Sequence, residues 1–250
     1  DASGKEEVFL DPNTFSKDGS TSLAGINFTQ DGSLVAYQIS EAGSDWRKVI
    51  VLNAVTKEKI GETLVDVKFS GVSWYKNEGF YYSSYDKPTG SELSAKTDQH
   101  KLYYHKLGTA QSEDKVVFGG DIKRRYVGGS VTEDNLYLVI SAANATSSNE
   151  LYLVDLTQPK FEIKTLVDNM VYDYDIIDNR GSKLYVITNN NAPNKKLMII
   201  DANNPELPNW LEVIPETENV LSVSTGGNYI FANYMKDAIG LQADDSFWNI

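Results

Sequence analysis

A polar turn followed by an apolar run recurs five times along this 250-residue chain at a nearly constant interval. Each repeat has an apolar residue, a turn with Asp, Asn or Gly, and then a run rich in tyrosine and β-branched residues. The turns centre on Gly32, Gly79, Asn135, Gly181 and Gly227, at spacings of 47, 56, 46 and 46 residues. A period of about 45 residues with several strands in each unit is typical of a β-propeller blade.

Each repeat divides into four short strands. In the first repeat, residues 25–28 and 34–39 flank Asp31-Gly32, which favours a tight hairpin because glycine accepts a positive φ. A third strand is expected at 48–52 and a fourth near 58–60. Helical periodicity is absent, so the chain is predicted to be all-β. The predicted four-stranded blades are 21–60, 67–118, 126–166 and 171–214.

The two ends of the chain carry incomplete repeats. Residues 7–10 resemble the outer strand of an earlier blade, and residues 219–239 resemble the start of a later one. Residues 240–250 are expected to be a tail that does not supply the third strand. We therefore expect residues 1–239 to be a partial propeller from a larger ring rather than a closed ring of four or five blades. An open arc leaves two unpaired edges, which predicts oligomerisation or low stability.

Composition excludes several classes of function. The formal net charge of −12 disfavours nucleic acid as a partner, because phosphates would be repelled. No apolar run reaches the length of about 18 residues that a membrane-spanning helix needs. The chain has no cysteine, which excludes disulfides and leaves cytoplasm and periplasm both open as compartments. It begins with Asp1 rather than Met, so we expect the natural start to lie upstream.

Residues for catalysis are scarce. The two histidines, His100 and His105, lie at the third strand of one repeat, and no Gly-x-Ser-x-Gly turn accompanies them. Both are interpreted as structural or surface residues, and their spacing argues against a zinc site. No glycine-rich phosphate loop follows a strand, so neither a nucleotide nor another cofactor is expected. Asp173, Asp175 and Asp178 are interpreted as a solvated face or turn, with a calcium site as the alternative.

The longest interval between turns contains an insertion at 86–99. The segment is polar and includes Pro88, which predicts a mobile loop. It is either a surface decoration or a lid over a cavity. The candidate gate residues in it are Lys87, Gly90, Glu92, Lys96 and Asp98.

Several motifs go beyond a generic propeller. They are Gly-Ser-Asp-Trp at 43–46, Val-Lys-Phe-Ser at 67–70, Gln-His-Lys-Leu-Tyr-Tyr-His at 99–105 and Tyr-Met-Lys-Asp at 234–237. In order and spacing the chain resembles the propeller of the prolyl oligopeptidase (prolyl endopeptidase) family of serine peptidases, S9, over residues 7–239. The resemblance implies a seven-bladed propeller that caps an α/β-hydrolase domain, in cis, carrying a Ser-Asp-His triad. This chain would supply blades two to five, the last strand of blade one and the opening of blade six. The triad lies outside it, so the chain alone is expected to be inactive.

The resemblance also implies a role. The parent enzyme would be a hydrolase that cleaves short proline-containing peptides after proline, and this chain would gate access to it. Phe69 matches an aromatic residue of the S3 pocket wall, and Asp45 matches a carboxylate that approaches an arginine of the catalytic domain. Val127 stands at a methionine position of that pocket and Asn144 near a cysteine position. The 86–99 loop matches the loop that guards the cavity between the domains.

Two alternatives remain. A non-catalytic propeller could bind a protein through one face, although the Gly-His and Trp-Asp pairs of WD-type repeats do not occur here. A related oligopeptidase that cleaves after basic residues would share the fold. The Gly-Ser-Asp-Trp and Lys-Leu-Tyr-Tyr-His motifs favour the prolyl branch.

Overall fold

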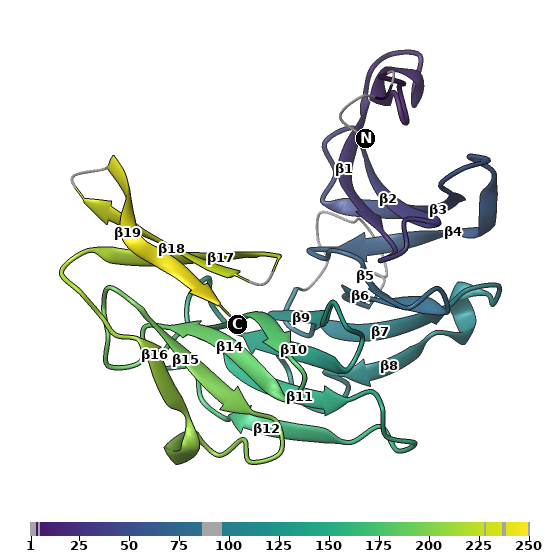
Figure 1. The fold of residues 1–250 in the computed structure, drawn as a ribbon. Coiled ribbons are helices and arrows are strands. Elements are labelled where there is room, and N and C mark those ends of the chain that lie inside the picture. The colour runs from purple at the N-terminus through teal and green to yellow at the C-terminus, as the bar shows by residue number, and fades with distance from the viewer. Residues whose placement is uncertain (1–3, 5, 87–96, 228, 237–238, 250) are drawn as a thin grey trace. The chain divides into compact units, whose positions relative to one another are not determined.

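The computed structural model describes residue 4 and residues 6–86, 97–227, 229–236 and 239–249, the last range as backbone only. The chain forms two compact units, Asp1–Asp121 and Ile122–Ile250. Every sheet is an antiparallel meander in which neighbouring strands follow one another in the sequence (Figure 1). The prediction of an all-β chain is confirmed.

The first unit contains two four-stranded sheets. The first sheet is β1 (Thr21–Phe28), β2 (Leu34–Glu41), β3 (Trp46–Asn53) and β4 (Lys59–Lys68). The second is β5 (Ser73–Tyr75), β6 (Gly79–Ser84), β7 (Lys101–Lys106) and β8 (Lys115–Phe118). Two single 3-10 turns accompany them, η1 (Pro12–Thr14) and η3 (Gln111–Glu113).

The second unit contains three sheets. The first is β9 (Tyr126–Val131), β10 (Tyr137–Ala143), β11 (Glu150–Asp155) and β12 (Ile163–Val167). The second is β13 (Tyr174–Arg180), β14 (Lys183–Thr188), β15 (Lys196–Asp201) and β16 (Leu211–Ile214), with the turn η4 (Leu207–Asn209) before its last strand. The third has three strands, β17 (Val220–Gly226), β18 (Tyr229–Lys236) and β19 (Ile239–Asn249).

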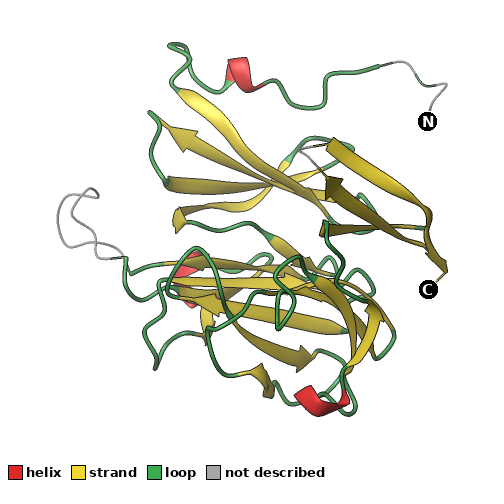
Figure 2. Ribbon diagram, turned by 90° about the vertical axis from the view of Figure 1, so that its left-hand side faces the viewer, coloured by secondary structure: helices red, strands yellow, loops and turns green. Residues whose placement is uncertain are grey.

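Helix contributes little to either unit. Figure 2 shows strands throughout, and the helices of the described residues are short 3-10 turns. None of the described helices is long and apolar enough to cross a bilayer.

Strand β4 is longer than the sequence predicts. It runs to Lys68 rather than ending near residue 60, because two register shifts against β3 and the positive φ values of Gly61 and Asp66 let the strand bend and continue. Such irregularities break the alternation of apolar residues on which strand prediction depends. Val67 and Lys68 therefore belong to the first sheet and do not open the second.

The expectation that the last repeat lacks its third strand was wrong. Strand β19 pairs with β18 from one end of β18 to the other, with a register shift between Phe231 and Asn233. The polar pair Asp244-Asp245 weakens the strand pattern in the sequence. A free edge on β18 would carry unpaired backbone groups, and pairing with β19 satisfies them.

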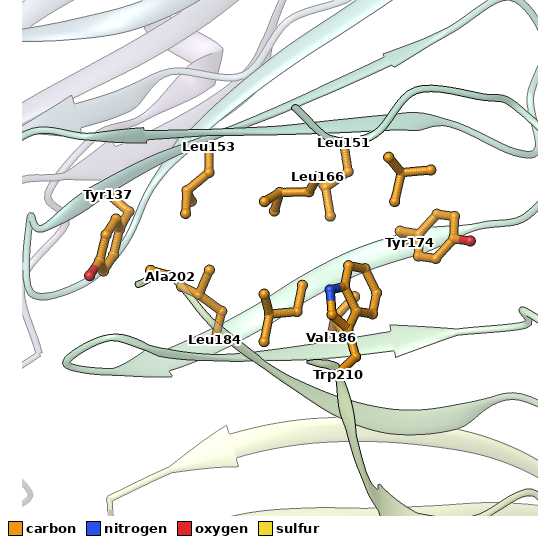
Figure 3. Packing of buried hydrophobic residues seen from close by; sticks show 11 residues of the cluster. Tyr137, Leu151, Leu153, Leu166, Tyr174, Leu184, Val186, Ala202 and Trp210 are labelled. Carbon is orange, nitrogen blue, oxygen red and sulfur yellow. The ribbon is translucent and has the colours of Figure 1, made fainter. Parts of the chain in front are cut away.

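Apolar side chains of successive sheets pack on each other within each unit. In the first unit, β4 of the first sheet contributes Leu64 and Val67, and β5 and β6 of the second sheet contribute Trp74 and Phe80. In the second unit Figure 3 shows two facing rows, formed by Leu151 and Leu153 on one side and by Leu184, Val186 and Trp210 on the other. Burying a whole Leu or Phe side chain contributes about 1.5–3 kcal/mol, so these contacts between sheets supply much of the stability of each unit.

The recurring turn also ties neighbouring sheets together. Asn77 Nδ2 donates to Asp31 Oδ2 at 2.8 Å, and in the second unit Asn179 Nδ2 donates to Asp134 Oδ2 at 2.7 Å. The backbone N–H of Ser33 and the amide of Asn77 lower the pKa of Asp31. In these two turns the aspartate is thus fixed as an acceptor for an asparagine of the next sheet.

Candidate functional site

Asp45 and Phe69 lie at the same end of the first sheet although they are well separated in the sequence. Strand β3 begins at Trp46 and β4 ends at Lys68, and these two residues form the terminal cross-strand pair. Asp45 and Phe69 adjoin that pair on its outer side. The structure therefore brings together two of the residues that the sequence nominates for substrate contact.

The ring of Phe69 is held in place although the residue is 43% exposed. Its φ is 50°, in the left-handed region that non-glycine residues occupy at a cost of about 1–2 kcal/mol. Tyr85 meets the ring edge-on at 6.2 Å, and Lys68 Nζ lies 5.1 Å from its centroid. Tyr85 and Lys68 thus fix an exposed aromatic ring that stands on a strained backbone.

Lys68 joins Phe69 to Trp46. Its ammonium lies 4.9 Å from the centre of the Trp46 ring as well as over Phe69, and the residue is only 9% exposed. Such a cation–π contact contributes about 0.5–1 kcal/mol at an exposed site and about 2 kcal/mol when desolvated. The indole Nε1 of Trp46 is buried and has no hydrogen-bond partner among the described residues.

His100 supports this cluster from the second sheet. It is fully buried, its ring stacks on Tyr85 at 4.4 Å, and its Nε2 donates to the carbonyl of Lys68 at 2.9 Å, since a carbonyl only accepts. Burial lowers the pKa of His100 to about 4, against the opposing effect of the Lys68 carbonyl. The imidazole is therefore neutral at pH 7, and the interpretation of His100 as a structural residue is confirmed.

The titration of His100 predicts a loss of stability in acid. The unfolded chain binds a proton near pH 6.5, whereas the folded chain resists it until about pH 4. The contribution of neutral His100 to the free energy of unfolding is therefore fully present above pH 6.5. It falls by about 3 kcal/mol as the pH drops to 4. Urea unfolding at both pH values, with His100→Gln as the comparison, checks this: the variant should lack this part of the decrease. An equal decrease in both proteins would contradict the assignment.

The candidate gate loop is fixed at its described ends. Lys101 Nζ pairs with Asp86 Oδ1 at 2.6 Å, and Gln99 Nε2 donates to the carbonyl of Gly120 at 2.9 Å. The two contacts hold the chain on either side of the insertion. Of the candidate gate residues, Asp98 lies within the described chain, and the structure does not describe Lys87, Gly90, Glu92 and Lys96.

Asp45 offers an exposed carboxylate. Within the described part of the chain this carboxylate forms no hydrogen bond or ion pair, and the turn is closed by Ser44, whose Oγ accepts from the N–H of Trp46 at 3.1 Å. Ser44 therefore caps the turn, which leaves Asp45 available to a partner.

Val127 and Asn144 lie together in the second unit, at the end where β9 begins and β10 finishes. Tyr126 pairs with Ala143, and Asn144 Oδ1 accepts from the N–H of Arg125 at 3.2 Å. Asn144 is exposed, whereas Val127 is only 3% exposed and packs inside the unit.

The four nominated residues occupy equivalent ends of their strands. In the first sheet, Asp45 precedes the third strand and Phe69 follows the fourth. In the sheet of β9 to β12, Val127 lies at the start of the first strand and Asn144 follows the second. The sequence interpretation missed Trp46, Lys68 and Tyr85 as members of the cluster around Phe69. Trp46 and Lys68 do fall inside the two quoted motifs, which was the available signal.

His105 belongs to a separate buried network. Its Nδ1 lies 2.8 Å from Asp114 Oδ1, and the hydroxyl of Tyr82 donates to Asp114 Oδ2 at 2.8 Å. The side chains of His105 and Asp114 are 4% and 3% exposed. The network joins β6, β7 and the segment before β8, which confirms His105 as structural.

Two of the three aspartates of 173–178 are paired, each with different residues. Asp173 accepts from Asn189 Nδ2 at 3.0 Å, and Asp178 pairs with Arg180 at 3.0 Å. No group of three or more His, Cys, Asp or Glu side chains among the described residues is arranged to hold a metal ion.

Comparison with known proteins gives a consistent result. Residues 1–241 match the family described as prolyl oligopeptidase, N-terminal beta-propeller domain. The chain is 54% identical over 241 residues to a prolyl endopeptidase of Elizabethkingia meningoseptica, covering 96% of this chain and 34% of that protein. It is 34% identical over 238 residues to prolyl oligopeptidase A of Amanita bisporigera, covering 84% of this chain and 31% of that protein.

Solved structures agree in fold. One, from a study of two prolyl endopeptidases and their inter-domain dynamics, superposes with a TM-score of 0.84 at 30% identity and covers 98% of this chain and 35% of that one. Prolyl oligopeptidase B of Galerina marginata, bound to a 25mer macrocyclization substrate, has a TM-score of 0.81 at 29% identity, over 92% of this chain and 34% of that one. The chain thus spans about a third of the length of these relatives. It belongs to the prolyl oligopeptidase family and has the fold of that family's N-terminal β-propeller domain.

Proposed function

We propose that this chain is the substrate-gating propeller of a serine-type prolyl endopeptidase. The parent enzyme would cleave short peptides after proline in an α/β-hydrolase domain in cis, which would carry the Ser-Asp-His triad. The observation that carries this proposal is the match of nearly the whole chain to about a third of a prolyl endopeptidase at 54% identity. The chain itself would contribute shape and electrostatics rather than acid–base groups.

We infer a ring of seven blades. The chain would supply four of them, with residues 7–10 as the last strand of the preceding blade and residues 219–239 as the opening of the next. Residues 7–10 are not in a strand here, which suits a segment whose neighbouring strands would lie upstream. Four four-stranded meanders at the period of the repeat support this assignment. The family match ends at residue 241, which supports a family domain that extends to about 239, and β19 continues the last sheet beyond it to Asn249.

The equivalent strand ends of successive propeller blades lie on one face. On that basis Asp45 and Phe69 would lie at the end of the first sheet that meets the hydrolase domain, and Val127 and Asn144 would lie at the corresponding end of their own sheet in the second unit. Phe69 would form part of the S3 wall. Because neighbouring side chains already hold its ring, little side-chain entropy would be lost when a peptide binds. Within the second unit, the buried Val127 would act on substrate contact through packing in its own sheet, and the exposed Asn144 would present a polar group.

Asp45 would fix the position of the hydrolase domain. Its carboxylate is exposed and takes no hydrogen bond within the described residues, which suits an ion pair with an arginine of that domain. A pair at a domain interface sets the register of closure and is sensitive to the access of water.

The 86–99 loop would act as a gate. A gate needs fixed ends, and the Asp86–Lys101 ion pair and the Gln99 amide supply them on either side. Closure would exclude water and large folded proteins while admitting short peptides.

The purified chain tests this division of labour directly. It is expected to release no product from a chromogenic peptide with proline before the scissile bond, because the triad would lie elsewhere. Cleavage by the chain alone that a serine-directed inhibitor abolishes would overturn the proposal. The intact prolyl endopeptidase relative serves as the positive control.

A further inference from the structure

A cavity of about 460 Å³ lies between β9 and β13 in the second unit. Small residues of β9 and β10 line one side of it, among them Gly128, Gly129 and Ser141. A Cβ atom placed on Gly128 would meet nothing within 4 Å. Close packing therefore does not require glycine there, and the missing side chains leave room for an occupant.

Each of the two strands is an edge strand of its sheet, and residues of both strands line the cavity. Among the described strands β9 pairs with β10 alone, and β13 pairs with β14 alone. Directly after β9, the N–H of Thr132 donates to the carbonyl of Tyr137 at 2.9 Å. Counting back from Thr132, the backbone groups of every second residue of β9 therefore point toward β10. By the same alternation the N–H and C=O of Gly129 point away from the sheet.

A side-chain amide already pairs with the backbone at the β13 edge. The N–H of Tyr174 donates to Asn149 Oδ1 at 2.8 Å, and Asn149 Nδ2 donates to the Tyr174 carbonyl at 3.0 Å. The amide of Asn149 thus pairs with this edge as the peptide group of an adjacent strand would. Ile176, two residues further on, points its backbone groups in the same direction and lines the cavity.

The cavity is acidic. Asp173 and Asp175 line it, and none of its lining residues is Lys, Arg or His. The carboxylate of Asp173 already accepts hydrogen bonds from the N–H of Ser148 and the side-chain amide of Asn189. The carboxylate of Asp175 is exposed and accepts no hydrogen bond from any described residue. The surrounding protein displaces part of its water, which raises the pKa of Asp175 against the weaker effect of Lys195.

We propose that this cavity binds an extended, positively charged peptide segment. Peptide groups of the segment would pair with the backbone of Gly129 and Ile176, and its ammonium or guanidinium group would meet Asp175. Strand addition to a free edge supplies affinity through the main chain, and a pocket for one side chain supplies selectivity. The site is remote from the Phe69 cluster in the sequence and needs no hydrolase domain. Its test is therefore independent of the proposed peptidase role.

Calorimetric titration of the whole chain with two matched peptides tests the site. The probes are acetyl-Thr-Lys-Thr-amide and acetyl-Thr-Glu-Thr-amide. The lysine peptide is expected to bind at least about tenfold more tightly, and Asp175→Asn should reduce the preference to less than about threefold. N-methylation of the peptide backbone should weaken binding of the lysine peptide, because the methyl group removes a strand donor.

A second variant separates binding from folding. Gly128→Val places a branched side chain in the open space and suits a strand, so binding should be lost while the melting temperature is kept. Asp121→Asn and Gly120→Val, outside the cavity, are the matched controls and should bind as the unaltered chain does. Equal affinity for both peptides, no binding at about 1 mM peptide, or full binding by Gly128→Val would each overturn the proposal.

Discussion

Replacing Asp114 by alanine is expected to lower the free energy of unfolding by about 3 kcal/mol. Asp114 accepts from Tyr82 and contacts His105 Nδ1, each at 2.8 Å, and its side chain is 3% exposed. The substitution leaves two buried polar groups without their partner and opens a small cavity beside them. The network joins three segments of the second sheet, so the loss should affect the cooperative unfolding of the first unit.

Urea denaturation followed by tryptophan fluorescence measures this effect. Asp121→Ala is the matched control, because Asp121 is exposed and its replacement should change stability by less than about 0.5 kcal/mol. If the two variants unfold at the same urea concentration, the His105–Asp114–Tyr82 network does not stabilise the fold as described.

Replacing Phe69 by alanine in a complete enzyme is expected to raise KM for proline peptides about tenfold, since burying an aromatic ring contributes about 1–3 kcal/mol. The complete enzyme can be the Elizabethkingia meningoseptica relative with its matching region exchanged for residues 1–241 of this chain. Alanine keeps the left-handed backbone strain at φ 50°, so the comparison isolates the ring. The measurement is steady-state kinetics over a series of peptides long enough to reach S3.

Val55→Ala provides the control for this experiment. Val55 is 83% exposed on a turn of the same sheet and has no place in the proposed site. Its replacement should leave KM unchanged. An unaltered KM for Phe69→Ala across all peptide lengths, with an unaltered melting temperature, would remove Phe69 from the substrate wall.

Much of the fold could be predicted from the sequence because its determinants are local. The Asp31-Gly32 turn and its counterparts recur at the period of a blade, and four of the five described sheets have the expected four strands. The two errors have one physical cause. Strand β4 continues through Gly61 and Asp66 at positive φ, and β19 forms where the polar pair Asp244-Asp245 hides the strand pattern. In both places pairing with a neighbouring strand outweighs the local signal.

The candidate site was less accessible to sequence reasoning. Asp45 and Phe69 were nominated by resemblance, and only the register of β3 on β4 explains why they lie at one end of a sheet. The stack of Tyr85 on His100 and the position of Lys68 between two rings depend on three-dimensional packing. Nothing in the identity of Phe69 predicts its left-handed backbone.

The most direct test of the account is the length dependence of cleavage by the exchanged enzyme. With residues 1–241 of this chain in place of the matching region of its prolyl endopeptidase relative, the enzyme is expected to cleave short peptides after proline. It is expected to leave a folded protein with an exposed proline uncut. A well-folded exchanged enzyme that cannot cleave short proline peptides, or one that cuts the folded protein as readily as the peptides, would contradict the role of this chain as a substrate-gating propeller.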